Sequence, residues 1–194
     1  MSNFELIKKI IEERRNINPA EFNDKKISDD DINSILSLAN WAPTHGRTEP
    51  WRILVLAGNA CANFGKTHAD LYKENTPKEK FLQDTYIKFE NQGIKSSHVL
   101  IVYSKRGKNP NIPEWEELAA TSAAVQNMLL GAEALGIAAF WSTGGQITKP
   151  SLKKYFELTD EENIIGVIYL GYSDKQLTGK RNTPIEDKIQ WIKN

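Results

Sequence analysis

Apolar residues recur at helical spacing near the start of the chain and again after residue 28. Positions 4, 7, 10 and 11 are apolar with charges between them, which predicts a helix that stops near residues 14–16. Ser28 with Asp31 three residues later resembles a capping box and predicts a second helix to about Asn40. Pro43 rules out a smooth continuation of that helix, because its ring clashes with the preceding turn.

Further helices are predicted in the second third of the chain and beyond. Thr76-Pro77-Lys78-Glu79 places proline at a first helical position, which predicts a helix that begins here and ends near Gly93. Residues 116–135 are rich in Ala, Leu and Met and contain no Pro, which predicts the longest, central helix, ended by Gly136. The stretch 142–150 should lead into another short helix.

Continuous apolar runs at 51–58, 98–104, 137–141 and 164–172 predict four strands, the second typical of a central strand. The predicted order is two helices, then four strands separated by single helices, then a polar, basic tail. That order favours an α/β or α+β layered fold in a single domain over residues 1–194.

Composition narrows the class of protein. The formal net charge is zero, so no global field attracts nucleic acid or anionic lipid. No segment approaches the roughly 18 apolar residues of a membrane span, and the N-terminus lacks the features of a signal peptide. Cys61 is the one cysteine, which fits a reducing compartment. We therefore expect a cytoplasmic protein that binds neither nucleic acid nor membranes.

The histidines and the single cysteine offer little chemistry. His45, His68 and His98 show no metal-type spacing and there is no cysteine pair, so no metal site is expected. There is no P-loop, G-x-S-x-G or G-x-G-x-x-G motif, which disfavours a Rossmann enzyme. His68 lies in a polar segment and is expected to be solvated, whereas His98 should make a backbone or capping bond.

A distributed set of cations remains. Arg14 and Arg15 follow the first predicted helix, Arg47 lies in a loop, and Lys180-Arg181 lie in the tail. A phosphate needs such donors together with hydroxyls and backbone amides. Each cation alone is more simply a solvated surface charge.

The stretch WAPTHGRTEPWR at residues 41–52 is too polar for a core and too rich in aromatic rings and cations for an ordinary connector. Proline at both ends limits its unfolded freedom. Trp51 is better placed as a core anchor of the following strand than as a ligand contact. Trp41 fits either role.

Five segments occur in an order that resembles the nitroreductase family. They are ERRN (13–16), LANWAPTHGRTEPWRILVL (38–56), AAVQNMLLGAEALGIAAFWSTGG (123–145), IIGVIYLGYS (164–173) and GKRNTPIEDKIQWI (179–192). The chain looks like the short bacterial, NAD(P)H-dependent members that contain FMN. The resemblance implies an α+β fold, with a central, mostly antiparallel sheet flanked by helices. It also implies an intertwined homodimer that holds two FMN molecules in its interface, each touched by both subunits.

The resemblance assigns the FMN phosphate and ribityl chain to two segments. Arg14, Arg15 and Asn16 match the stretch after the first helix, where Asn replaces the Ser of the family. Lys180 and Arg181 match the basic pair of the tail.

Other positions match the segments around the flavin ring. Trp141, Ser142 and Thr143 would run beside the ring, and Gly144 would allow close backbone approach. His45 and Arg47 would reach the flavin of the partner subunit, and Trp41 and Thr44 would lie on the substrate side. Many members carry Asn at the position of Arg47 and Gln at that of Glu49, which bears on substrate preference.

The activity implied by the resemblance is oxidoreduction in two halves. FMN would accept a hydride from NADH or NADPH and pass it to a small-molecule acceptor such as a nitroaromatic or a quinone. No side chain is predicted as a catalytic residue, and Arg15 or Arg47 would stabilise the reduced flavin. Two alternatives stay open: a flavin-binding carrier or sensor without turnover, and a non-flavin binding protein whose cations are surface charges.

Overall fold

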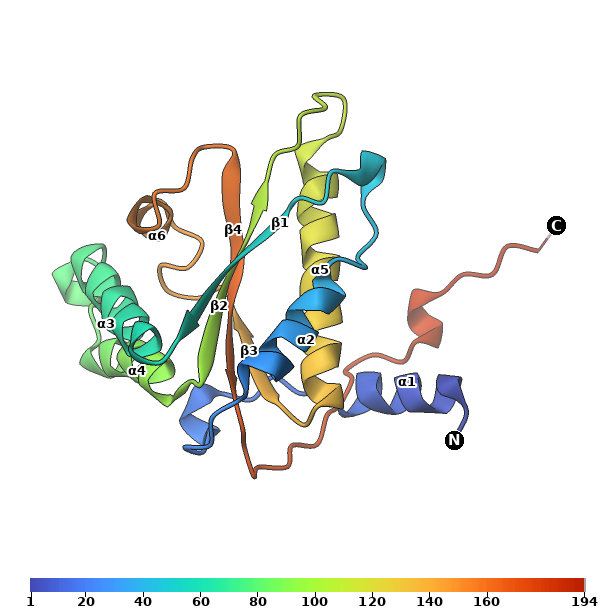
Figure 1. Ribbon diagram of the computed structural model, residues 1–194, viewed down its shortest axis with the longest axis horizontal. Coiled ribbons are helices and arrows are strands. Elements are labelled where there is room, and N and C mark those ends of the chain that lie inside the picture. Colours follow the sequence, from blue (N-terminus) through green and yellow to red (C-terminus); the bar gives the residue numbers. More distant parts are fainter. Residues whose placement is uncertain (194) are drawn as a thin grey trace.

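The computed structural model describes residues 1–193 and contains one four-stranded antiparallel sheet (Figure 1). The strand order is β1-β2-β4-β3, which confirms the predicted α+β fold with an antiparallel sheet. Each predicted apolar run forms one of the strands, which are β1 (Trp51–Ala57), β2 (His98–Lys105), β3 (Ala138–Ser142) and β4 (Glu162–Gly171).

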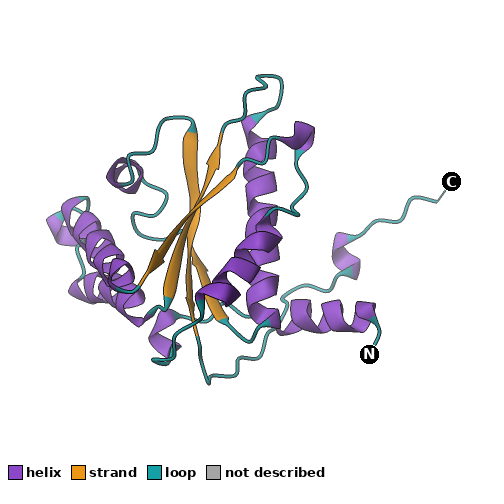
Figure 2. Cartoon of the chain, viewed as in Figure 1, coloured by secondary structure: helices purple, strands orange, loops and turns teal. Residues whose placement is uncertain are grey.

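Helices cover both faces of the sheet (Figure 2). Two of them, α2 and α5, pack on one face, while α3, α4 and α6 lie on the other (Figure 1). Side chains of β2 alternate between these layers: Leu100 and Val102 join the first core, whereas Val99 and Ile101 join the second. The helices are α1 (Asn3–Glu13), α2 (Asp29–Ala39), α3 (Asn59–Glu74), α4 (Gln83–Lys95), α5 (Glu114–Ala134) and α6 (Pro150–Tyr155).

The predicted helix boundaries near residues 28 and 136 are confirmed. The Ser28 hydroxyl accepts a hydrogen bond from the Asp31 amide at 3.1 Å, as an N-cap should. Gly136 follows α5 with a φ of 69°, a left-handed conformation that glycine adopts without steric cost.

The segment between β1 and β2 differs from prediction. It holds two α-helices rather than one. Thr76-Pro77 does not begin the α-helix, because Pro77 precedes a single turn of 3-10 helix at Lys78–Lys80 and α4 starts only at Gln83. The buried positions of α3 are 61, 64, 65, 68 and 69, which is regular helical spacing. Because these positions include Cys, Gly and His, the apolar stripe is not visible in the sequence.

Two glycines explain why α3 and α4 pack so closely. A methyl group at Gly65 would overlap the backbone of α4 at Glu90 and Gly93, and one at Gly93 would overlap the backbone of α3. The contact is therefore made backbone to backbone, and large apolar side chains are not needed there.

His68 is buried and not solvated, which corrects the prediction. Its ring stacks on Phe89 at 4.2 Å between centroids, and Nε2 accepts a hydrogen bond from the Gln146 amide at 3.1 Å. Burial lowers the pKa of His68 to about 4, since the packed interior cannot solvate an imidazolium. His98 is also buried, and its ring contacts the Ser97 hydroxyl and the Asp29 carboxylate rather than a backbone group.

Two segments extend away from the layered body: α1 and the tail beyond β4 (Figure 1). No residue of α1 is buried, and Phe4 is 72% exposed. Trp191 in the tail is 80% exposed. Within residues 1–193, no helix combines the length and the apolar character that crossing a membrane would need.

Replacing His68 with Gln should make the free energy of unfolding depend less on pH below pH 6.5. The histidine pKa falls from 6.5 to about 4 on folding, so the unfolded state binds the proton more tightly. The contribution of His68 to the free energy of unfolding is therefore fully present above pH 6.5. It is lost as the pH falls toward and below 4, and the complete loss is about 3 kcal/mol. Gln still offers an acceptor to the Gln146 amide, so urea titrations across this window should show a smaller loss for His68→Gln. Equal losses in the two proteins would contradict the assignment.

Candidate functional site

The segment after α1 lies against the outer strand of the sheet. The Ile17 amide donates to the Ala139 carbonyl at 2.9 Å. The Asn16 side chain accepts from the Trp141 amide at 2.8 Å and donates to its carbonyl at 3.5 Å. Asn16 thus behaves as one more residue pairing with the free edge of β3, which brings two predicted flavin contacts together.

Arg15 lies where the tail returns to the body. Its Nη1 donates to the carbonyls of Glu12 at 2.5 Å and Arg14 at 2.8 Å, whereas Nε is buried without a hydrogen-bond partner among the described residues. A methyl group at Gly179 would overlap the guanidinium. The tail therefore packs directly on Arg15 at Gly179. Lys180, the next residue, is exposed.

A cleft of about 450 Å³ adjoins Arg15. Burial raises the pKa of Glu133 in its wall and the nearby Glu13 raises it further, while Arg14 and Arg15 lower it. The carboxylates of Glu13 and Glu133 thus lie close to the cations of Arg14 and Arg15, where the end of α1 meets the last turns of α5. The lining residues are Glu13, Arg15, Ile17, Glu133, Lys175, Gln176 and Leu177.

The segment after β3 is held in place by buried aromatic side chains. The Ser142 hydroxyl accepts from the Gly144 amide at 3.3 Å, and Thr143 and Gly144 are exposed. Gly145 has a φ of 64°, and a methyl group there would overlap the rings of His68 and Phe89. His68 therefore positions the segment that was predicted to run beside the flavin, a role that its polar surroundings in the sequence did not suggest.

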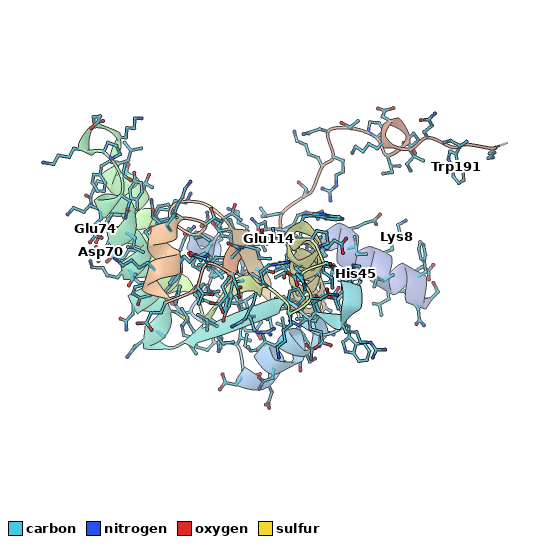
Figure 3. All side chains as sticks on the ribbon, turned by 90° about the horizontal axis from the view of Figure 1, so that it is seen from above. Lys8, His45, Asp70, Glu74, Glu114 and Trp191 are labelled. Atoms are coloured by element: carbon cyan, nitrogen blue, oxygen red, sulfur yellow. The ribbon has the colours of Figure 1, made fainter. Side chains whose placement is uncertain are left out.

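The other predicted contacts form a second group at the start of α5. His45 Nδ1 lies 2.6 Å from Glu116 Oε2, next to the first turn of that helix (Figure 3). The Thr44 and Thr48 hydroxyls are 2.9 Å apart. Arg47 and Glu49 have φ values of 54° and 43°, an unusual conformation for residues with side chains. Such strain is kept where the surroundings over-determine it, often at functional sites.

The two tryptophans of this stretch have different roles. Trp51 is buried and donates from Nε1 to Asn40 Oδ1 at 3.1 Å, which confirms it as a core anchor. Trp41 is 83% exposed. It lines an apolar groove of about 290 Å³ between α1, α2 and α5, with Ile7, Ile10, Leu38, Asn127, Leu130, Gly131 and Ala134.

The two groups of predicted residues are far apart within one chain. His45 contacts Glu116, whereas Arg14 and Arg15 act on Glu133, 17 positions further along α5. At 1.5 Å per residue that separation is about 26 Å. The structure therefore brings together Arg14, Arg15, Asn16, Trp141 and the tail, but not His45, Arg47 or Thr44 with them.

A second cleft, of about 970 Å³, was not predicted from the sequence. It lies between the strained loop at 46–49 and the loop that follows β2. Three of the cations that line it, Lys105, Arg106 and Lys108, are close together in the sequence, but Arg47 and Arg52 come from another segment, so the cleft itself is not visible in the sequence. The lining residues are Gly46, Arg47, Thr48, Arg52, Lys105, Arg106, Gly107, Lys108, Asn109, Pro110 and Glu161.

The arrangement can be compared with known proteins. A model of the nitroreductase family matches residues 11–172. The chain belongs to the nitroreductase family. YfhC of Bacillus subtilis (strain 168), provisionally named an NAD(P)H nitroreductase, is 31% identical over 187 residues, covering 95% of this chain and 93% of YfhC.

Solved nitroreductase structures share the fold. A nitroreductase-like family protein from Bacillus cereus aligns over 100% of both chains, with a TM-score of 0.82 and 28% identity. NfnB from Mycobacterium smegmatis, an FMN-dependent nitroreductase crystallised with NADPH, has a TM-score of 0.77 at 13% identity, covering 99% of this chain and 100% of NfnB.

In this nitroreductase, Asn16→Ala should loosen the edge of β3. The variant loses the acceptor for the Trp141 amide, so exchange of that amide with solvent should accelerate about five- to tenfold. Hydrogen exchange read by NMR measures this effect. Asn33→Ala is the matched control, because Asn33 is exposed on α2. Unchanged protection of Trp141 in Asn16→Ala would contradict the pairing.

Proposed function

We propose that this chain is an FMN-dependent NAD(P)H oxidoreductase that reduces small-molecule acceptors such as nitroaromatics or quinones, and that it works as a homodimer. The observation that carries the proposal is the Arg15 guanidinium, held between the end of α1 and the tail with a buried, unpartnered Nε among the described residues. Family membership supports the cofactor and the reaction class.

The residues present fit the phosphate end of FMN. A buried N–H donor without an acceptor is costly, and a phosphate oxygen is the acceptor that a guanidinium binds best. Arg14 lies next to this group in the chain, and Lys180 and Arg181 follow Gly179 at the same place. These four cations would hold the phosphate, offset by the carboxylates of Glu13 and Glu133.

The strand edge beside Arg15 suits the rest of the cofactor. Asn16 fixes the backbone of Trp141, and the residues that follow it, Ser142 to Gly144, leave the sheet with an exposed backbone. His68 and Phe89 support that segment from behind. These residues would orient the flavin ring along β3.

A second copy would complete the site. His45 and Arg47 of one chain cannot reach the Arg15 cluster of the same chain across about 26 Å of α5. The apolar groove along α1, α2 and α5 and the exposed α1 offer a surface for a partner subunit. His45 of the partner subunit would then approach the flavin held by Arg15.

Bound FMN supplies the hydride transfer between NAD(P)H and the acceptor. No side chain is assigned as a general acid. Trp41 and Thr44 would shape the entry for the acceptor.

Purified protein is expected to carry FMN, and Arg15→Gln should bind it at least tenfold more weakly, because a charge-assisted phosphate contact is lost. Flavin fluorescence titration of the apoprotein measures the affinity. Lys88→Gln is the control, since Lys88 is exposed on α4, on the opposite face of the sheet. Equal affinities of Arg15→Gln and wild type would refute the assigned phosphate site.

The reaction itself is tested by the colour of the flavin. Anaerobic NADH or NADPH should bleach the 450 nm region, as is general for flavins, and a nitroaromatic or a quinone should restore it. Bleaching without recovery on either acceptor would favour the carrier or sensor alternative. Protein that binds no FMN would overturn the proposal as a whole.

The proposed dimer interface can be tested with a charged substitution in the apolar groove. Ile7 is 50% exposed in the single chain, so Ile7→Asp should leave the subunit folded but place a charge in the apolar groove. Sedimentation velocity should show a dimer for wild type and a monomer, or a dimer weakened at least tenfold, for Ile7→Asp. Ile94→Asp, also 50% exposed but on α4, should remain dimeric. A monomeric wild type would rule out the shared site.

A further inference from the structure

We propose that the cleft between the 46–49 loop and the loop after β2 binds the 2′-phosphate of NADPH and makes NADPH the preferred electron donor. This inference rests on the proposed function and names its donor. Three cations that face the cleft, Arg47, Arg52 and Lys108, would contact the phosphate.

The cleft gathers charge from three separate segments. Arg47 comes from the strained loop, Arg52 from the start of β1, and Lys105, Arg106 and Lys108 from the end of β2 and the loop beyond it. Glu161 is the one carboxylate among the lining residues of this described cleft. In a protein of zero formal net charge, such a local excess of cations is set by the fold.

Two of these cations are already neutralised. Arg106 forms an ion pair with Glu117, whose side chain is 1% exposed, and Lys105 Nζ lies 3.2 Å from Glu162 Oε1. Within the described part of the chain, Arg52 donates only to the carbonyls of Glu49 and Trp51. Among residues 1–193, neither Arg47 nor Lys108 has an ion pair or a side-chain hydrogen bond. Their charges, with that of Arg52, remain available to an anion.

The buried Glu117 also fixes the wall of the cleft. Its Oε1 accepts from the Gly107 amide at 2.8 Å, and Arg106 Nη2 donates to the Ile112 carbonyl at 2.9 Å. A methyl group at Gly107 would overlap Glu117 and Thr48, so the two loops touch at this point. A binding wall that is ordered before the ligand arrives avoids the entropic cost of ordering it on binding.

The charge pattern suits a phosphate monoester. A monoester concentrates about two negative charges on three oxygens, which match two guanidinium forks and one ammonium group. Lys108 and Arg52 lie in a cleft of about 970 Å³ that is lined by five cations, so a small anionic ligand fits better than a nucleic acid backbone.

The cleft lies next to the segment that is proposed to contact the flavin, where the electron donor NADPH would bind. It begins at Gly46 and Arg47, directly after His45, which the proposed function places at the flavin of the partner subunit. A dinucleotide whose nicotinamide lies at the flavin would extend its adenosine end away from the ring, toward this cleft. NADPH differs from NADH only by the 2′-phosphate, so cations there would select between them.

Steady-state kinetics test the inference on the FMN-loaded protein. Lys108→Gln should raise KM for NADPH about tenfold, and the double variant Arg52→Gln with Lys108→Gln should raise it further, with kcat and KM for NADH little changed. The control removes two exposed cations from the opposite layer, Lys73→Gln with Lys88→Gln, and should behave as wild type. Equal changes in KM for NADH and NADPH would overturn the assignment.

Direct binding separates this inference from the proposed function. Calorimetry should show adenosine 2′,5′-bisphosphate binding wild type at least tenfold more tightly than adenosine 5′-diphosphate, with the difference lost in Lys108→Gln. Equal affinities for the two nucleotides would refute a 2′-phosphate site even if the flavin is present and active. Protein without FMN that still discriminates the two nucleotides would support the cleft and reject the oxidoreductase.

Discussion

The length of α5 sets the arrangement of every candidate residue. This helix runs along one face of the sheet and is buried at nine of its positions, from Glu117 to Ala132. Its first turn contacts His45, and its last turns lie beside Arg14 and Arg15. A rigid spacer of this kind keeps the two groups apart in one subunit. Only a second copy, or a large movement of the chain, would let them act on one ligand.

Buried carboxylates set the charge of the unpredicted cleft. Glu117 and Glu162 are nearly inaccessible, so each must be paired or hydrogen-bonded to remain charged. Arg106 pairs with Glu117 of α5, and Lys105 pairs with Glu162 across the neighbouring strands β2 and β4. The two carboxylates neutralise Lys105 and Arg106. The other cations of the cleft, Arg47, Arg52 and Lys108, remain exposed. The ion pairs that fix the end of β2 against α5 and β4 thus determine which charges face solvent.

The elements that were predicted correctly from the sequence are those with a strong apolar pattern or a clear capping residue. Continuous apolar runs located all four strands, and the cap at Ser28 and Gly136 marked helix ends correctly. The prediction failed on α3, whose buried face consists largely of Gly, His, Ala and Cys, and on Pro77, which precedes a turn. The hydrophobic signal is weak there, because tight packing of Gly65 on Gly93 replaces large side chains.

Site residues divide in the same way. Motif resemblance identified Asn16 and Trp141, which the structure does bring into contact, and Arg15, on which the tail packs. It could not identify His68, whose role comes from burial against Phe89, nor the cleft, whose cations come from three segments. Such features depend on tertiary contacts, and even the cations at residues 105–108 become part of a cleft only when the loop at 46–49 packs beside them.

The exposed first helix gives an independent reason to expect a partner surface. An isolated helix of 11 residues is marginal in water, and the capping box at Ser2 and Glu5 adds only part of the stability that it needs. Tertiary packing supplies little more, because none of its residues is buried, and Phe4, Leu6 and Ile7 are half exposed or more. Yet this helix ends at Arg14 and Arg15, so any loss of its order would displace both cations. A cover over its apolar side would stabilise the helix and the phosphate site together, which ties cofactor binding to association of the subunits.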